Sequence, residues 1–277
     1  MFQLRCTVRN CRRSLQVVES GLACPAGHHF DRAKQGYWNL LQPQDRRSRQ
    51  PGDPDEAVLA RHRWLQRGHA SSLVDALRPW SLCLAPVQST RPTQTLDLGC
   101  GEGTFAPELF SADAEGYCGI DLSKRAIRLA ARRWPAATWV LANADRELPA
   151  DDGSVDRVVS LFGRRPIAEI RRVLAPGATC IIAVPGEDDL IELRQQVQQA
   201  GHRRRRWELI VEEMSAAGID LVQQMHWRQE MWLEPDEIAD ALAMTYRGAR
   251  HSQQQRAESL PAMNVTSAAD LMLLRRD

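Results

Sequence analysis

Two stretches of the sequence combine residue types and spacings that can bind ligands, and the first is a cysteine and histidine cluster. Cys6-x4-Cys11 is followed by Cys24-x3-His28. Each pair is close enough to chelate one ion, and thiolates with an imidazole are ligands that zinc binds tetrahedrally. Four protein ligands would close the coordination sphere, so the sequence predicts a structural zinc. His29 is a competing fourth ligand, and free core thiols are the alternative without a metal.

The second stretch is a glycine loop after a short apolar run. Thr95-Leu-Asp-Leu-Gly-Cys-Gly-Glu-Gly103 predicts a buried strand that turns into a helix. Its three glycines, Gly99, Gly101 and Gly103, let backbone amides approach a ligand closely. A nicotinamide-binding loop would have its third glycine where Thr104 stands. The spacing therefore favours S-adenosylmethionine (SAM), which has no pyrophosphate.

Polar side chains accompany this strand and the next two. Asp97 precedes the first glycine by two residues, where its carboxylate can reach the methionine ammonium of SAM. Asp121 ends the next apolar run, where a carboxylate can accept hydrogen bonds from both ribose hydroxyls or can cap a helix. Asn143 and Asp145 follow the third run, where they would contact adenine or serve as turn residues. We therefore predict that these four side chains bind the cofactor.

Positioning such a site requires alternating strands and helices. Apolar runs predict strands at residues 95–98, 117–120, 138–141, 155–161 and 179–184. Ser123 is the predicted N-cap of a helix that ends before Pro135. The apolar runs at 221–232 and 264–273 predict a pair of antiparallel strands. The expected fold is an α/β class I SAM methyltransferase, a Rossmann-like doubly wound sheet, preceded by a small zinc-binding module.

Composition divides the chain into three parts. Residues 1–41 form the metal module, residues 42–94 a basic loop, a helical segment and a connector, and residues 95–277 the methyltransferase domain. The helical segment spans 55–84, with breaks expected at Gly68 and Pro79. Lys and Arg outnumber Asp and Glu by 14 to 7 over residues 1–93, whereas over 94–277 they number 22 against 28. A basic N-terminal third favours a phosphate-bearing partner, although an arginine-rich source would leave the same excess.

The residues after the fourth predicted strand limit which atoms can accept the methyl group. Leu161-Phe-Gly-Arg164 lacks the Asn/Asp-Pro-Pro-aromatic box of exocyclic-amine methyltransferases. Cys180 lies within an apolar run, which indicates a core thiol rather than the nucleophile of carbon-5 pyrimidine methylation. A ring nitrogen or an oxygen remains as the acceptor. Phe162 either borders the transferred methyl group or only caps the sheet.

A leader and a membrane-spanning run are both missing from the sequence, so we expect a cytoplasmic protein without membrane contact.

Further motifs resemble those of the bacterial 23S rRNA (guanine-N1)-methyltransferase family, over most of residues 5–195. They are Cys24-Pro-x-x-His28-x-Phe-Asp31, Gly36-Tyr-x-Asn-Leu-Leu41, Arg47-Ser-Arg-x-Pro-Gly-Asp53, Gly68-His69, Asp121-x-Ser-Lys-x-Ala-Ile127 and Glu192-Leu193. The Arg-Ser-Arg and Pro-Gly-Asp elements look closer to the branch acting in one hairpin of domain II than to the macrolide-resistance branch. The chain departs from the family in its four-residue knuckle spacing, at Gly163-Arg164, where Ala-Pro is usual, and at 244–249.

The resemblance implies methylation at N1 of a guanine in a hairpin of 23S rRNA, and a homodimer. The zinc module would grip the RNA together with Arg46, Arg47 and Arg49. Asp53 is the family-matched candidate for accepting the N1 proton, with loop capping as the alternative. Two other functions remain open from the residues alone: methylation of a small metabolite, and SAM binding without turnover in an RNA or protein interaction module.

Overall fold

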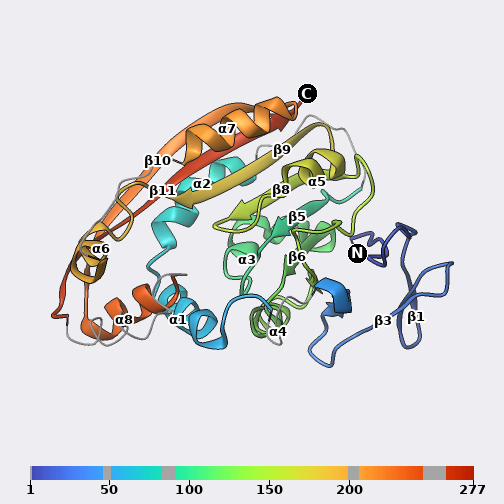
Figure 1. The fold of residues 1–277 in the computed structure, drawn as a ribbon, viewed down its shortest axis with the longest axis horizontal. Coiled ribbons are helices and arrows are strands. Elements are labelled where there is room, and N and C mark those ends of the chain that lie inside the picture. Colours follow the sequence, from blue (N-terminus) through green and yellow to red (C-terminus); the bar gives the residue numbers. More distant parts are fainter. Residues whose placement is uncertain (1, 46–50, 83–90, 199–205, 246–259) are drawn as a thin grey trace.

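The protein is built around one eight-stranded mixed sheet, shown in the computed structural model of Figure 1. The structure describes residues 2–45, 51–82, 91–198, 206–245 and 260–277. The strand order across the sheet is β10-β11-β9-β8-β5-β6-β7-β4. The strands are β4 (Trp38–Asn39), β5 (Thr95–Leu98), β6 (Tyr117–Asp121), β7 (Thr138–Leu141), β8 (Val155–Leu161), β9 (Leu174–Pro185), β10 (Ile219–Leu233) and β11 (Met263–Arg276).

Strand direction agrees with the sequence prediction. Strands β4 to β9 pair in parallel, whereas β11 runs antiparallel to both β9 and β10. Every predicted strand is confirmed, and three of them, at 95–98, 138–141 and 155–161, have the predicted bounds. The carboxyl ends of the parallel strands lie at one edge of the sheet, where an α/β fold places its ligand.

Helices cover both faces of the sheet (Figure 1). One face packs against α2 (Ser71–Ser81), α3 (Phe105–Phe110) and α4 (Lys124–Arg133), and the other against α5 (Ile167–Val173) and α7 (Trp207–Ala216). Val158 and Val159, neighbours in β8, point into the two opposite cores, as alternation along a strand requires. Ser123 caps α4 as predicted, accepting a hydrogen bond from Ala126 N at 3.4 Å. Among the described helices, none has both the length and the apolarity to cross a bilayer.

A third cluster lies beyond the sheet. It joins α1 (Asp55–Gln66), α6 (Ile191–Gln198) and α8 (Pro235–Ala243) to the ends of β10 and β11, through buried residues that include Trp64 and Leu193. The predicted break at Gly68 is confirmed, because α1 ends before it and α2 begins after it. The predicted break at Pro79 is wrong, since Pro79 lies inside α2. A proline in the last turn costs that turn one backbone hydrogen bond. The end of α2 is held by Trp80, which is buried and donates to Gln223 at 3.1 Å.

The N-terminal module is fused to the large sheet. Its own antiparallel sheet consists of β1 (Gln16–Val18), β2 (Gly21–Ala23) and β3 (His29–Asp31), and the following β4 pairs in parallel with β7. Leu4 and Leu22 of the module share a buried cluster with Leu96 and Val140 of the sheet. Among the described residues, two short 3-10 helices span Pro43–Asp45 and Ser111–Gly116. The metal module is therefore held in a fixed position relative to the cofactor loop.

Candidate metal centre and cofactor site

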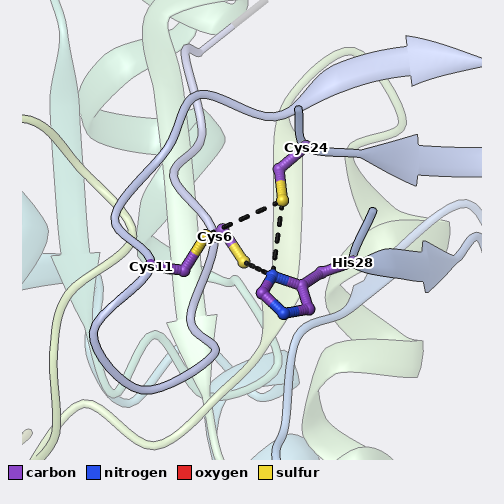
Figure 2. A group of neighbouring side chains, drawn as sticks. All are labelled: Cys6, Cys11, Cys24 and His28. Carbon is purple, nitrogen blue, oxygen red and sulfur yellow. Dashed lines mark hydrogen bonds between the residues drawn. The ribbon is translucent and has the colours of Figure 1, made fainter. Parts of the chain in front are cut away.

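The four predicted metal ligands come together in the N-terminal module (Figure 2). Their ligand atoms all lie within 4.8 Å of one another. Cys11 Sγ is 3.7 Å from Cys24 Sγ, and His28 Nδ1 is 3.5 Å from Cys6 Sγ and 3.4 Å from Cys24 Sγ. A tetrahedral zinc with Zn–S bonds of ~2.3 Å separates its sulfurs by ~3.8 Å, so the cluster fits the ion. His29, the competing ligand, instead contacts Ser20 Oγ at 3.0 Å.

Tight turns shape this cluster. The loop between Cys6 and Cys11 contains Asn10 at φ 64°, and the hydrogen bond from Cys11 N to Val8 O, at 2.9 Å, closes it. Gly27, at φ 82°, lies in the second turn, where Gly27 N donates to Cys24 O at 2.9 Å.

Burial raises the pKa of the Cys24 thiol, but the backbone amides of His28 and Ala26 lower it to about 7. The Cys24 thiolate is thus available at neutral pH, whereas burial raises the pKa of the Cys6 thiol to about 12, so an ion must displace the Cys6 proton.

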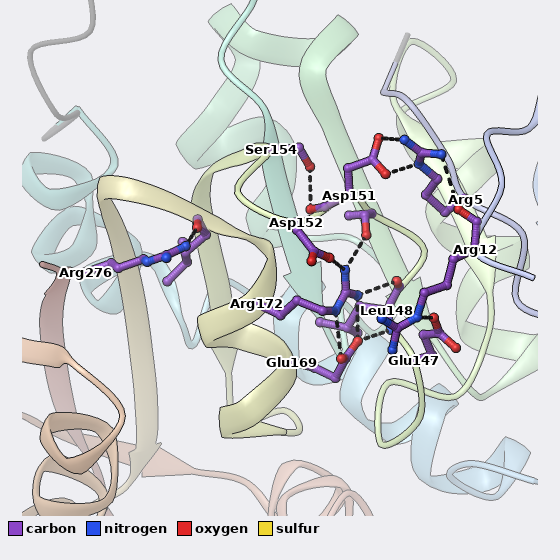
Figure 3. Close-up of polar contacts among 12 residues, drawn as sticks. Arg5, Arg12, Glu147, Leu148, Asp151, Asp152, Ser154, Glu169, Arg172 and Arg276 are labelled. Atoms are coloured by element: carbon purple, nitrogen blue, oxygen red, sulfur yellow. Dashed lines mark hydrogen bonds and ion pairs between the residues drawn. The ribbon is translucent and has the colours of Figure 1, made fainter. Parts of the chain in front are cut away.

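Ion pairs attach the metal module to the sheet (Figure 3). Arg5 pairs with Asp151 and Arg12 with Glu147, and Arg5 N donates to Pro149 O at 3.0 Å. These acceptors lie in the loop between β7 and β8, and side chains of α5 hold this loop in place by hydrogen bonds. Glu169 accepts from Leu148 N at 2.7 Å, and Arg172 donates to Leu148 O at 3.0 Å, to Ala150 O at 2.8 Å and to Glu169 at 2.7 Å. The module therefore rests on a rigid support.

The glycine loop connects β5 to α3 in a conformation that requires glycine. Gly99, Gly101 and Gly103 have φ values of 75°, 58° and 72°. A Cβ on Gly103 would lie 2.7 Å from the Trp139 ring and 2.9 Å from Ala130 Cβ, so this glycine lets the loop pack against α4. Gly99 N donates to Ile120 O at 2.8 Å, which ties the loop to β6. The amides of the loop are thereby placed at the carboxyl edge of the sheet.

Two carboxylates flank the loop, Asp97 buried and Asp121 half-buried. Asp97 accepts a hydrogen bond from the Tyr117 hydroxyl, and burial raises the pKa of Asp97 to about 7. Asp121 accepts from Gly101 N at 2.9 Å with one oxygen and from Ser123 N at 2.7 Å with the other, and burial raises its pKa as well. The contact with Ser123 N holds the turn before α4, but Ser123 and not Asp121 is the N-cap of that helix, so the helix-capping alternative for Asp121 is wrong. Each carboxylate oxygen has a second lone pair, which is available to a ribose hydroxyl.

Arg61 and Glu102 form an ion pair that sequence reasoning missed. Glu102, in the glycine loop, is 1% exposed, and Arg61 Nε in α1 donates to its Oε2 at 3.2 Å. Arg61 also donates to Asp53 Oδ2 at 2.8 Å. Although burial alone would lower it, the charges of Glu102 and Asp53 raise the pKa of Arg61 above its usual range. The sequence gives little signal for this pair, because a glutamate between two glycines does not reveal its own burial, and only a buried carboxylate requires a partner.

The predicted adenine-side residues form a second polar cluster. Asp145 N donates to Asn143 Oδ1 at 3.0 Å, a turn contact. Arg164 donates to both Asp145 oxygens, at 2.8 and 2.5 Å, from the loop after β8. This arginine stands where a proline was expected from the family. The turn role is present for both residues, and adenine contact stays a prediction.

Phe162 is an exposed aromatic residue directly after β8. It lies at the carboxyl end of β8 with φ 60°, a left-handed conformation that is rare for an aromatic residue, and it is 45% exposed. Cys180 in β9 is fully buried, and burial raises its thiol pKa to about 12, which confirms it as a core residue rather than a nucleophile. Arg46, Arg47 and Arg49, the predicted RNA contacts, lie outside the described residues, as do residues 246–249.

Comparisons with known proteins agree with both sites. Residues 95–177 match the family described as Methyltransferase domain, and residues 4–49 match the family described as RlmA, N-terminal, a zinc ribbon. The solved structure of the YcgJ protein from Bacillus subtilis superposes with a TM-score of 0.51 at 15% identity, covering 73% of this chain and 97% of that one. That likeness shows the fold alone. The matches identify a SAM-dependent methyltransferase with a structural zinc.

Curated relatives extend over both parts of the chain. The 23S rRNA (guanine(748)-N(1))-methyltransferase of Streptomyces fradiae is 32% identical over 87% of this chain and 84% of its own length. A provisionally assigned 23S rRNA (guanine-N(1)-)-methyltransferase of Micromonospora griseorubida is 34% identical over 69% of this chain and 68% of its own. With the zinc ligands and the glycine loop both in place, the chain belongs to the 23S rRNA (guanine-N1)-methyltransferase family.

Proposed function

We propose that this protein transfers the methyl group of SAM to N1 of a guanine in a hairpin of 23S rRNA. The observation that carries the proposal is the pairing of β4 with β7, which fixes the zinc module to the same sheet that carries the cofactor loop. A module held there can bind RNA while one base of that RNA enters the methyltransferase site. A small-metabolite methyltransferase has no evident use for such an attachment.

The described residues divide the work of binding the methyl donor. Asp97 would hold the methionine ammonium, Asp121 the ribose hydroxyls, and Asn143 with Asp145 the adenine. SAM supplies an electrophilic methyl group on a sulfonium. The amides of the glycine loop and these carboxylates keep that group in one orientation, and alignment with the acceptor nitrogen contributes much of the rate.

The acceptor must be presented as an unpaired base. Guanine N1 lies on the Watson–Crick edge, so the target guanine has to be extruded or single-stranded before it can react. As the N1–carbon bond forms, the carbon–sulfur bond breaks and the N1 proton leaves. The exposed ring of Phe162 at the end of β8 offers the base an aromatic surface. Asp53 is the candidate for accepting the proton, although its ion pair with Arg61 supports the loop-stabilising role.

The partners follow from the same proposal. The substrate is RNA, the predicted grip of Arg46, Arg47 and Arg49 acts together with the zinc module, and the active form is a homodimer in the cytoplasm. Whether the target is guanine 748, the base named for the Streptomyces fradiae relative, or a neighbouring guanine is decided by mapping the product.

One assay tests the reaction. The purified protein is incubated with labelled SAM and protein-free large-subunit RNA, and the RNA is digested to nucleosides. We expect label in 1-methylguanosine. Label in another nucleoside, or none in RNA while SAM still binds, would reject the proposal, and the second outcome would favour an interaction module. Label that appears only in the small-molecule fraction of a cell extract would favour a metabolite methyltransferase.

A further inference from the structure

A cleft of about 180 Å³ lies where the zinc module meets the methyltransferase sheet. One wall belongs to the N-terminal part of the chain and the other to the loop after β7. The lining residues are Thr7, Arg9, Leu40 and Gln44 on the first wall and Ala142, Asn143, Arg146 and Glu147 on the second. Because Asn143 is also a predicted adenine contact, the cleft lies on the zinc side of the cofactor site.

The loop between Cys6 and Cys11 contributes to one wall of this cleft. Thr7 and Arg9 both lie in this loop, between the two cysteines. Thr7 Oγ1 donates to Leu40 O at 2.7 Å, which fixes the base of the wall. The loop thus places an arginine at the junction between the module and the sheet.

The cleft presents hydrogen-bond donors and positive charge. Arg9 is exposed and makes no hydrogen bond or ion pair with any described residue, and Arg146 supplies a second guanidinium. Asn143 Oδ1 already accepts from Asp145 N, which leaves its amide NH₂ as the group able to donate. Glu147 is the single carboxylate of the lining, and Arg12 neutralises it. Such a lining favours an anion with several acceptor oxygens.

Size and rigidity restrict the anion to a small group. Sites for small molecules and cofactors usually enclose about 300–1,000 Å³, so a cleft of about 180 Å³ suits a phosphate better than a whole nucleoside. Both walls are fixed before binding, the first by the pairing of β4 with β7 and the second by the Arg12–Glu147 and Arg5–Asp151 pairs. A preformed site binds with little loss of conformational entropy.

We propose that this cleft binds one backbone phosphate of the substrate RNA, with Arg9 and Arg146 as its cationic ligands. The proposal rests on the proposed function and adds a contact to it. β7 is three strands from β8 in the sheet order, a separation of ~14 Å at ~4.8 Å per strand. The cleft is therefore within reach of nucleotides that flank a guanine bound at Phe162.

The test compares Arg9→Ala with Arg13→Ala. Arg13 lies in the same module, is also exposed, carries the same charge and does not line the cleft. Binding of a hairpin of the RNA that the wild type methylates is measured by fluorescence anisotropy over a salt series. For Arg9→Ala we expect affinity about tenfold weaker and a salt slope reduced by about one. Arg13→Ala should keep the slope, and Arg9→Lys should recover most of it.

Controls separate this proposal from the proposed function. Zinc content, melting temperature and SAM affinity should match the wild type in all three variants. A wild type that methylates the RNA, with Arg9→Ala and Arg13→Ala alike in affinity and slope, would overturn the cleft and leave the proposed function intact. A wild type that neither binds nor methylates the RNA would overturn both. Unchanged binding of Arg9→Ala to naked RNA, with methylation lost only in assembling particles, would indicate a protein ligand and also reject the cleft proposal.

Discussion

The metal cluster and the cofactor loop are two ligand sites built in opposite ways. Four side chains within 23 residues supply the metal ligands, and two tight turns bring them together. The cofactor loop uses backbone amides, whose position depends on three neighbouring strands and on Arg61 from a distant helix. The contrast shows that a metal site can be specified locally, whereas a nucleotide-type site needs a completed sheet.

The largest expected effect comes from breaking the local site. Cys24→Ser should lower zinc from about one per chain to near none and reduce RNA methylation by more than about a hundredfold, because structural zinc contributes folding energy directly. Atomic emission spectroscopy and the methylation assay measure both. His29→Ala, which removes the neighbouring histidine, should retain the metal. Full zinc in Cys24→Ser would contradict the ligand set.

Asp97→Asn is the matching change in the cofactor site. The loss of a charge-assisted hydrogen bond should weaken SAM binding by about tenfold to a hundredfold, measured by titration calorimetry. Wild-type affinity should fall as pH drops below about 7, where Asp97 protonates, and the variant should lose this dependence. Equal pH profiles for the two proteins would show that Asp97 is not the ammonium ligand.

Asp97 should also make folding stability depend on pH, in the opposite direction to SAM affinity. Its pKa is raised from 3.8 to about 7 in the folded protein, so its contribution to stability is fully present below pH ~4 and is lost as pH rises through 7. Asp97→Asn should therefore raise the melting temperature relative to wild type more at pH 8 than at pH 5. A difference that does not change with pH would contradict the burial argument.

Arg61→Ala tests whether the cofactor loop depends on a distant helix. Glu102 would remain buried without its partner, and we expect the free energy of unfolding to fall by ~2 kcal/mol, less than for a fully buried pair because Arg61 is partly exposed. Chemical denaturation measures this change. Adding Glu102→Gln should restore part of the stability, and a double variant no more stable than Arg61→Ala would reject the coupling.

The smallest expected effect concerns Arg164 and Asp145. Their side chains are 67% and 43% exposed, so Arg164→Ala should change stability by less than ~1 kcal/mol. If Asp145 contacts adenine, freeing it from Arg164 should change the KM for SAM a few-fold and leave kcat nearly constant. An unchanged KM would leave the pair as a turn contact only.

Sequence reasoning succeeded where a pattern is local. Buried parallel strands are short apolar runs, which is why the strand at 155–161 could be placed without error. The spacing of Cys24 and His28 likewise predicts chelation. The pairing of β4 with β7 and the contact between Arg61 and Glu102 join segments about 100 and 41 residues apart. No periodicity reports such contacts, because they arise only after the chain has folded.

The two-residue strand β4 has a consequence for the apoprotein. It covers the outer edge of β7, which would otherwise end the sheet with unpaired backbone amides and carbonyls. An open edge of that kind is a template for pairing with another chain, and short edge strands are one means of preventing it. Because β4 follows directly from the zinc-held module, metal loss would uncover this template. We therefore expect the metal-free protein to self-associate more readily than the zinc-bound protein.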